Sequence, residues 1–246
     1  MSARIVTVYS TKGGVGKTTT AVTLASIAAA DGNRVLLWDL DPQAASTWLL
    51  EVKQKMRGGA GAVFAGDAPL KKAIRGTDVQ GLDVVPADAS YRDLDIALDA
   101  AKKSSSRLAK ALKPLKSVYD VIIIDCPPGA SLVAENALHV ADVVVTPLSP
   151  ALLSLRSYEQ VTAFLAEQES RAKLIAFLNM VDRRKKTHRD AAERLPSEIR
   201  GLSDIVVPAS VVVERMGERH EAVTEFAASS DPAKAFRALW HVVSRA

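Results

Sequence analysis

The chain has one cysteine, few aromatic residues and no long hydrophobic run. Of its 246 residues 5% are aromatic, and the single cysteine is Cys126. One cysteine excludes an internal disulfide, and the longest apolar runs are well short of a membrane span. Metal-ligand spacing is also missing among the four histidines, which are His139, His188, His220 and His241. These absences argue against a disulfide framework, a histidine metal centre and a membrane-spanning protein.

Export signals are missing as well. The opening residues lead directly into a β-like segment, without the charged, apolar and cleavage regions of a signal peptide. We therefore expect no export and a reducing, cytoplasmic setting. A formal charge of +4 is compatible with an acidic partner but does not demand one. The apolar content of 48% is enough for a full hydrophobic core.

Short β-branched runs alternate with helix-forming stretches along the chain. The runs are continuously apolar, which is typical of strands covered on both faces. They span residues 4–10, 34–40, 81–87, 119–125, 141–148, 174–181 and 204–210. Strand, helix and strand in repetition predict an α/β fold, a mostly parallel twisted sheet with helices on both faces. Because no linker or internal repeat is visible, we expect one domain over residues 1–246.

Four other segments carry expectations. Residues 18–32 read as a helix of small residues that stops near Gly32, and residues 57–66, RGGAGAVFAG, as a loop. The positive charges of 102–117 predict a solvated helix face. The tail from Pro232 has apolar residues at helical spacing, which suits either a membrane-surface helix or a closing helix docked on the core. We favour docking.

A glycine-rich loop follows the first expected strand. The stretch Ser10 to Thr20, STKGGVGKTTT, precedes a helix-forming run, and its glycines allow successive N–H groups to face phosphates. Lys17 would reach the outer phosphate oxygens and Thr18 would offer its hydroxyl to Mg²⁺. This context predicts a P-loop NTPase that binds a nucleotide with Mg²⁺. The predicted nucleotide contacts here are Lys12, Gly13, Gly14, Val15, Gly16, Lys17, Thr18 and Thr19.

The start of this loop departs from the usual pattern. Thr11 stands where the first glycine is expected, and Lys12 adds a second lysine ahead of the paired glycines. With DLDPQAAST at 39–47 and IIIDCPPG at 122–129 in order, the chain resembles the ParA/MinD family of deviant Walker A ATPases, closest to the ParA/Soj branch. The resemblance covers most of the chain and thins across 51–118. A related iron–sulfur protein with the same loop needs two cluster cysteines per chain and is excluded.

The resemblance implies that ATP drives a homodimer in which Lys12 reaches into the partner's site. A cation there stabilises the charge that develops during phosphoryl transfer. The competing interpretation is that Lys12 attracts the phosphates of its own chain. Catalysis is thus assigned to Lys12, Lys17 and Asp41.

The carboxylates follow two expected strands, where ligands bind in open α/β sheets. By resemblance Asp41 positions the attacking water, and Asp39 supports the magnesium and threonine shell. Asp125 closes the run VIIID and would hold Mg²⁺ through water. The predicted metal residues are therefore Thr18, Asp39 and Asp125. Residues 127–129, PPG, form a candidate switch near the terminal phosphate.

Two residues further along are assigned to adenine by resemblance. Asn179 ends the run LIAFLNMV, and Pro208 begins the stretch that matches the base-packing loop. The alternative for Asn179 is a buried strand-end asparagine bonded to backbone. Asn179 and Asp182 have the N-x-x-D spacing of guanine-binding motifs, but the lysine that lies between the two residues in those motifs is missing.

A basic block follows at 183–189, RRKKTHR. Such blocks neutralise DNA phosphates without reading the sequence, although an exposed helix start with ordinary charge is the alternative. The predicted DNA contacts are Arg184, Lys185, Lys186, Arg189, Arg215 and Arg219.

These features predict an ATP-operated positioning switch in the cytoplasm, associated with the nucleoid. Its cargo is a DNA locus or a protein assembly, and a ParB-like or cargo-adaptor protein stimulates an ATPase that is weak alone. We expect no stable membrane association. A MinD-like membrane-associated ATPase and a small-molecule ligase of the same superfamily are the alternatives.

Overall fold

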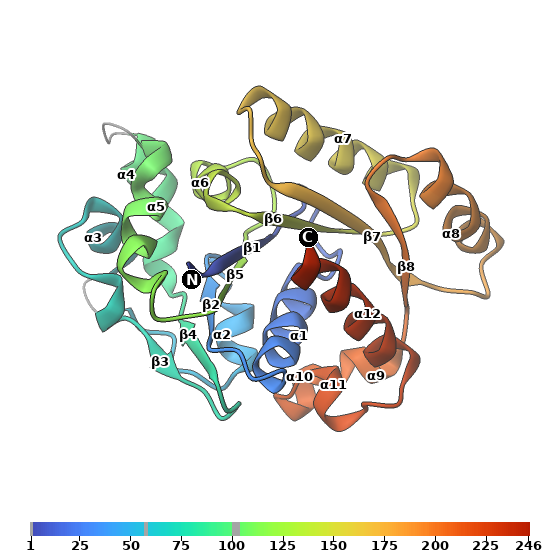
Figure 1. The fold of residues 1–246 in the computed structure, drawn as a ribbon, viewed down its shortest axis with the longest axis horizontal. Coiled ribbons are helices and arrows are strands. Elements are labelled where there is room, and N and C mark those ends of the chain that lie inside the picture. The colour runs from blue at the N-terminus through green and yellow to red at the C-terminus, as the bar shows by residue number, and fades with distance from the viewer. Residues whose placement is uncertain (1, 57–58, 100–103) are drawn as a thin grey trace.

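The computed structural model describes residues 2–56, 59–99 and 104–246, and Figure 1 shows a central sheet with helices on both faces. The strands are β1 (Arg4–Val8), β2 (Val35–Asp39), β3 (Arg75–Gly76), β4 (Leu82–Val85), β5 (Val121–Asp125), β6 (Val143–Leu148), β7 (Lys173–Val181) and β8 (Leu202–Pro208). They form one eight-stranded sheet in the order β3-β4-β2-β5-β1-β6-β7-β8. All seven expected strands are present, and the short β3 is an addition.

The sheet is parallel except at one edge. β3 pairs with β4 antiparallel, and every other pair is parallel. β1 lies between β5 and β6, so the loop after β1 emerges next to the carboxyl end of β5. The predicted mostly parallel α/β fold is confirmed. The strand order brings the predicted phosphate and carboxylate residues together at the carboxyl ends of β1, β2 and β5.

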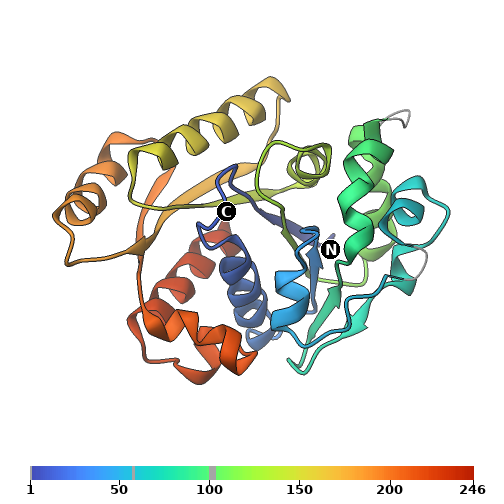
Figure 2. The same ribbon diagram turned by 180° about the vertical axis from the view of Figure 1, so that it is seen from behind.

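Twelve helices surround this sheet in the described part of the chain. They are α1 (Lys17–Ala30), α2 (Ala45–Leu49), α3 (Gly59–Ala65), α4 (Leu94–Asp99), α5 (Arg107–Leu112), α6 (Leu132–Val140), α7 (Leu152–Glu167), α8 (Lys186–Glu198), α9 (Val211–Glu214), α10 (Met216–Arg219), α11 (Val223–Phe226) and α12 (Asp231–Arg245). Short 3₁₀ turns lie at Leu70–Lys72, Ala89–Asp93, Ser104–Ser106 and Lys113–Leu115. Figures 1 and 2 show α1 and α12 on one face of the sheet, and α4 to α7 on the other.

Successive strand residues supply two separate cores. On β2, Leu36 and Trp38 pack in the core under α3 to α7, whereas Val35 and Leu37 pack in the core under α1 and α12. This alternation is the reason that the strands read as continuous apolar runs, because both faces are covered. A smaller third cluster lies where α8 meets β7 and β8.

The expectation of a loop over 57–66 is wrong for the residues that the structure describes. Gly59–Ala65 form α3, and residues 57 and 58 lie outside the described part. Ala60, Val63 and Phe64 of α3 are buried, and the Phe64 ring lies 5.8 Å from that of Trp38. Burial of these side chains outweighs the weak helix propensity of the glycines.

The other segment expectations are confirmed where they are described. α1 stops at Ala30, with Gly32 in the left-handed conformation just beyond. In 104–117, Lys110 and Lys113 are exposed while Leu108 and Leu112 are buried; residues 102 and 103 lie outside the described part. The tail helix α12 begins with Pro232 in its first turn.

The apolar face of α12 packs on the protein itself. Phe236, Leu239, Trp240 and Val243 are all buried in the core shared with α1. The Trp240 indole N–H donates a hydrogen bond of 2.8 Å to Asp31 Oδ2 at the end of α1. The closing-helix expectation is therefore confirmed. No helix in the described ranges is long and apolar enough to cross a membrane.

Candidate nucleotide-binding site

The phosphate loop connects β1 to α1 and contains two glycines in the left-handed conformation. Gly14 has φ +69° and Gly16 has φ +89°, values that other residues adopt at a cost. Gly16 is the N-cap residue of α1 and supplies no side-chain cap, so the first N–H groups of the helix stay open to an anion. The local geometry is that of a phosphate cradle.

Lys17 lies inside this cradle. Its side chain is buried, and Nζ donates a hydrogen bond of 3.2 Å to the carbonyl oxygen of Lys12. Burial lowers the pKa of Lys17, whereas the charges of Asp125 and Asp41 raise it. The charges of both carboxylates thus act on the ammonium group, and the predicted contact of Lys17 with the phosphates stays a prediction.

Asp39 and Asp125 end neighbouring strands at the same level. They are register partners on β2 and β5, and both are almost completely buried. Burial, followed by the charge of Asp125, raises the pKa of Asp39 to about 7. Burial is also the main reason that the pKa of Asp125 rises to about 6. The sheet holds two carboxylates in a dry environment next to the phosphate loop.

The hydrogen bonds of Asp39 go to protein groups. Oδ2 accepts from the backbone N–H and the hydroxyl of Thr47, at 2.9 and 2.7 Å, and Oδ1 accepts from Asp41 N. The Thr47 hydroxyl in turn accepts from Ala87 N. Asp39 therefore anchors α2 to the sheet, and its predicted part in a magnesium shell stays a prediction.

Asp125 retains a free oxygen. Ser46 donates a hydrogen bond of 2.7 Å to Oδ2, whereas Oδ1 is buried without a hydrogen-bond partner in the described residues. The Thr18 hydroxyl lies close enough to lower the pKa of Asp125. An unsatisfied carboxylate oxygen beside a hydroxyl fits Mg²⁺ with its water shell, because Mg²⁺ binds oxygen ligands and keeps several waters. Within the described ranges, no group of three or more His, Cys, Asp or Glu side chains is arranged so that it could hold a metal ion directly.

Asp41 lies at the rim, just beyond β2. It is half-buried, and Oδ1 accepts a hydrogen bond from Gln43 N. Ala44 N also donates a hydrogen bond to the Asp41 carbonyl oxygen, which closes a tight turn around Pro42 and Gln43. The charge of Asp41 acts on both Lys17 and Asp125, and its predicted role in positioning the attacking water stays a prediction.

Lys12 contacts its own chain in this structure. Nζ donates to Ser149 Oγ at 3.1 Å and to Ser154 Oγ at 3.3 Å. These serines follow β6, and their hydroxyl groups are 2.6 Å apart. The predicted reach of Lys12 into a partner's site stays a prediction.

A cavity of about 430 Å³ joins the phosphate loop to the two residues predicted to contact adenine. Gly14, Gly16, Thr18 and Thr19 line one part, and Asn179 and Pro208 line another. The Asn179 amide donates a hydrogen bond of 2.8 Å to Val15 O, and Met180 N bonds to its oxygen. Asn179 is thus a strand-end asparagine bonded to backbone, as the alternative described. The adenine contacts predicted for Asn179 and Pro208 are compatible with this cavity and stay predictions.

Sequence reasoning missed Trp48 and Met180. Both line this cavity, and their side chains are 50% and 46% exposed. The edge of the Trp48 ring meets His220, with 4.6 Å between the ring centroids. One signal was present, because the apolar residue Trp48 directly follows the motif DLDPQAAST. Its ring partner His220, however, is about 170 residues further along the chain.

The basic block spans the loop after β7 and the first turn of α8. Arg184 is 91% exposed and pairs with Asp182 at 2.9 Å, and α8 begins at Lys186. Arg215 pairs with Glu218 at 3.9 Å, and the Arg219 guanidinium lies over the ring of Phe226. Figures 1 and 2 place α9 and α10 apart from α8, so these two arginines belong to another part of the surface. The predicted DNA contacts remain predictions.

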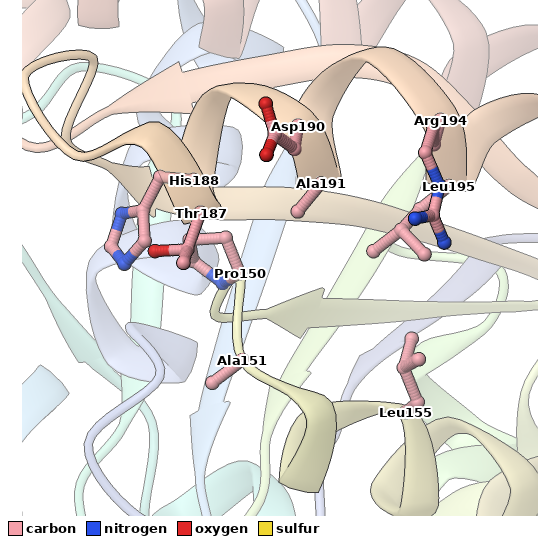
Figure 3. A pocket seen from close by; sticks show the side chains of 9 residues that line it. All are labelled: Pro150, Ala151, Leu155, Thr187, His188, Asp190, Ala191, Arg194 and Leu195. Atoms are coloured by element: carbon pink, nitrogen blue, oxygen red, sulfur yellow. The ribbon is translucent and has the colours of Figure 1, made fainter.

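A different cavity of about 520 Å³ opens beside the basic block. Figure 3 shows it between the start of α7 and one side of α8. Asp190 and Arg194 bring opposite charges to its lining, and Leu155 and Leu195 add apolar side chains. It contains none of the residues predicted to bind ATP or Mg²⁺.

The fold, the phosphate loop and the carboxylates at its side define a P-loop NTPase. A family model described as an AAA domain matches residues 3–176. The chain is 35% identical over 225 residues to the chromosome partitioning protein ParA of Caulobacter vibrioides, covering 85% of this chain and 82% of the relative. It belongs to the ParA/MinD family of ATPases.

Solved structures agree. The septum site-determining protein MinD of Pyrococcus horikoshii, complexed with Mg-ADP, superposes with a TM-score of 0.81 at 25% identity and covers 99% of this chain and 96% of that one. Cobyrinic acid a,c-diamide synthase of Mycobacterium smegmatis, with bound ADP and magnesium, gives 0.83 at 27% identity, with 99% and 94% covered. Both similar proteins hold ADP with magnesium.

Proposed function

We propose that the chain is an ATP-operated positioning switch. ATP and Mg²⁺ drive a homodimer, the dimer holds nucleoid DNA without sequence preference, and a partner protein stimulates hydrolysis and release. One observation carries this proposal: the phosphate cradle holds Lys17 where the charge of Asp125 acts on it, and the same loop contains the additional lysine Lys12. The partitioning relative supports positioning as the purpose of the ATPase.

Each residue of the site has a separate task. Lys17 and the loop N–H groups bind the phosphates, Thr18 and Asp125 hold Mg²⁺, and Asp41 orients the attacking water. Magnesium, when bound, neutralises charge on the phosphates. Lys12 leaves Ser149 and Ser154 and completes the partner's site.

Complementation tests whether Lys12 acts across the dimer. Lys12→Ala should reduce stimulated ATP turnover by roughly 10²–10³, the usual cost of losing a transition-state donor. Asp41→Ala should bind ATP and form a persistent dimer without hydrolysing it. An equal mixture of the two variants, combined before ATP is added, should recover roughly a quarter of wild-type turnover, because random pairing makes half of the dimers mixed and gives each one complete site. If the mixture stays inactive, Lys12 serves its own chain. Wild-type turnover by Lys12→Ala alone would refute both assignments.

DNA binding is assigned to the basic block because its charges oppose the local helix dipole. Lys185, Lys186 and Arg189 stand at the N-terminal end of α8, where cations are unfavourable and anions favourable. Phosphates would relieve this repulsion. We expect ATP-dependent binding to random duplex that weakens with salt.

Charge reversal tests this surface. Arg184→Glu with Lys185→Glu should abolish binding to random duplex, measured by fluorescence anisotropy at several salt concentrations. The matched control is Lys71→Glu with Lys72→Glu, an equal charge change on an exposed turn beside β3. If the two double variants bind duplex equally well, the block is not the contact surface.

Two alternatives have different readouts. A membrane role for the apolar face of α12 is disfavoured because that face is buried, and liposome pelleting should recover no ATP-bound chain. The likeness to cobyrinic acid a,c-diamide synthase keeps a ligase as the second candidate. Stimulation of the ATPase by a small carboxylic acid with ammonia or glutamine, rather than by a protein, would favour the ligase.

A further inference from the structure

A cavity of about 480 Å³ lies between α6 and α7, and it shares no lining residue with the nucleotide cavity. Tyr9 and Thr11, at the start of the phosphate loop, form part of its wall, as does Gly129 of the candidate switch. Glu135 of α6 and Gln160 of α7 contribute polar groups. The cavity therefore lies against the phosphate loop and the candidate switch, separate from the nucleotide cavity.

Glu135 is the one charged side chain among the lining residues. It is half-buried in the first turn of α6, where the helix dipole favours a negative charge. Within the described ranges no ion pair or side-chain hydrogen bond involves its carboxylate. The cavity thus offers an uncompensated anion in a protein of positive net charge.

The remaining lining suits a long basic side chain. Tyr9 and Phe164 supply aromatic rings, which attract cations, and the Gln160 amide adds a polar group. Leu138 and Val161 supply apolar surface for an aliphatic stem. Glu135 would repel an anionic ligand. An apolar ligand would bury the Glu135 carboxylate without an opposite charge to compensate it. An arginine fits best, because its planar fork pairs with a carboxylate and stacks on a ring.

Three hydrogen bonds connect the cavity to the catalytic loops. The Tyr9 hydroxyl donates to Gly129 O at 3.0 Å, and the Thr11 hydroxyl donates to Gln160 Oε1 at 2.9 Å. Gly129 N donates to Thr11 O, also at 3.0 Å. A side chain bound in this cavity therefore lies against residues that are hydrogen-bonded to the start of the phosphate loop and to the switch. Thr11 takes part through its hydroxyl group, which glycine lacks.

We infer that this cavity receives an arginine side chain of the protein partner that stimulates hydrolysis. The inference rests on the proposed function, since it assigns a docking site to that partner. The arginine stem packs on Leu138 and Val161, its guanidinium pairs with Glu135, and its backbone stays at the surface. Docking shifts the bonds among Thr11, Gly129 and Gln160.

The test is a binding titration followed by NMR. The probe is acetyl-Ala-Ala-Arg-Ala-Ala-amide, added to the ATP-bound chain while the amide signals of Thr11 and Gly129 are monitored. A peptide with uncharged citrulline in place of arginine is the control ligand. We expect shifts with the arginine peptide alone and binding at least roughly tenfold weaker in Glu135→Gln, the loss expected for a hydrogen bond to a charged group. Phe164→Leu should also weaken binding.

Glu159→Gln is the matched control variant. It removes the same charge from an exposed position on α7 that does not line the cavity, so binding should stay at the wild-type level. All three variants should retain basal ATPase activity, which confirms an intact fold.

Four results overturn the inference: no shifts, equal shifts with the citrulline peptide, unchanged affinity in Glu135→Gln, or spermidine binding as tightly as the peptide. The last would identify a free polyamine as the ligand. The proposed function fails separately, if the wild-type chain shows no ATP-dependent dimer and no DNA binding while the peptide still binds through Glu135.

Discussion

Replacing Gly16 with alanine tests the contact between the phosphate loop and Asn179. An alanine Cβ at this position would lie 2.3 Å from Asn179 Nδ2, too close for any heavy-atom contact. Asn179 is buried there and donates its hydrogen bond to Val15 O. The substitution therefore strains the backbone and also displaces a buried amide.

The two effects have different sizes. A left-handed conformation costs an alanine about 1–2 kcal/mol, partly offset by about 0.4–1 kcal/mol from a less flexible unfolded chain. Loss of the bond from Asn179 to Val15 leaves buried polar groups unsatisfied, which costs a further 1–3 kcal/mol or so. We expect Gly16→Ala to lower the free energy of unfolding by about 1–5 kcal/mol in total, most of it from the Asn179 contact.

Gly14→Ala is the matched control. Gly14 is also left-handed, with φ +69°, but nothing lies within 4 Å of an added Cβ. In urea unfolding without nucleotide, Gly14→Ala should lower the free energy of unfolding by about 1 kcal/mol, because only the backbone conformation is strained. The difference between the two alanine variants then measures the Asn179 contact.

An Asn179→Ala background completes the cycle. With the amide removed, the costs of Gly16→Ala and Gly14→Ala should agree within about 0.5 kcal/mol, as for uncoupled sites. Equal costs in the wild-type background, or a gap that persists without Asn179, would refute the reasoning.

Three further predictions concern other contacts. Trp48→Ala should weaken ATP binding but leave tripolyphosphate binding unchanged in calorimetry, because Trp48 lines the nucleotide cavity against Gly217 and His220 and is not part of the phosphate loop; equal losses would place Trp48 at the phosphates. Phe236→Ala should lower the free energy of unfolding by about 3–5 kcal/mol, since this ring of α12 is fully buried, whereas the exposed Val242→Ala should change it by less than about 0.5 kcal/mol. Similar values would mean that α12 is not docked in solution. Thr47→Val should cost about 1–3 kcal/mol, because Asp39 loses a donor and Ala87 N its acceptor; a variant as stable as the wild type in urea would contradict the anchoring of α2.

Local patterns were reliable where burial and backbone geometry leave a direct mark on residue type. Strands covered on both faces must be apolar throughout, so seven strands could be found from the sequence. Left-handed turns favour glycine, so the phosphate loop could be found as well. The pattern failed at α3, where Ala60, Val63 and Phe64 look like part of a glycine-rich loop until Trp38 packs on them.

The tail shows the same limit. Its helical spacing predicted α12 but left open whether the apolar face meets a membrane or the protein. Packing of Trp240 and Phe236 beside α1 decides this, since burial of the face depends on residues some 200 positions away.

Sequence alone determined the fold class, the phosphate loop and the identity of Lys17, Asp41 and Asp125 as candidates, because these depend on neighbouring residues and on short motifs. Tertiary structure decided which distant groups meet. Asn179 bonds to Val15 across 164 positions, and Glu135 and Gln160 enclose a cavity behind Thr11. Side chains so far apart in the sequence come together through strand order and helix packing, which no local pattern contains.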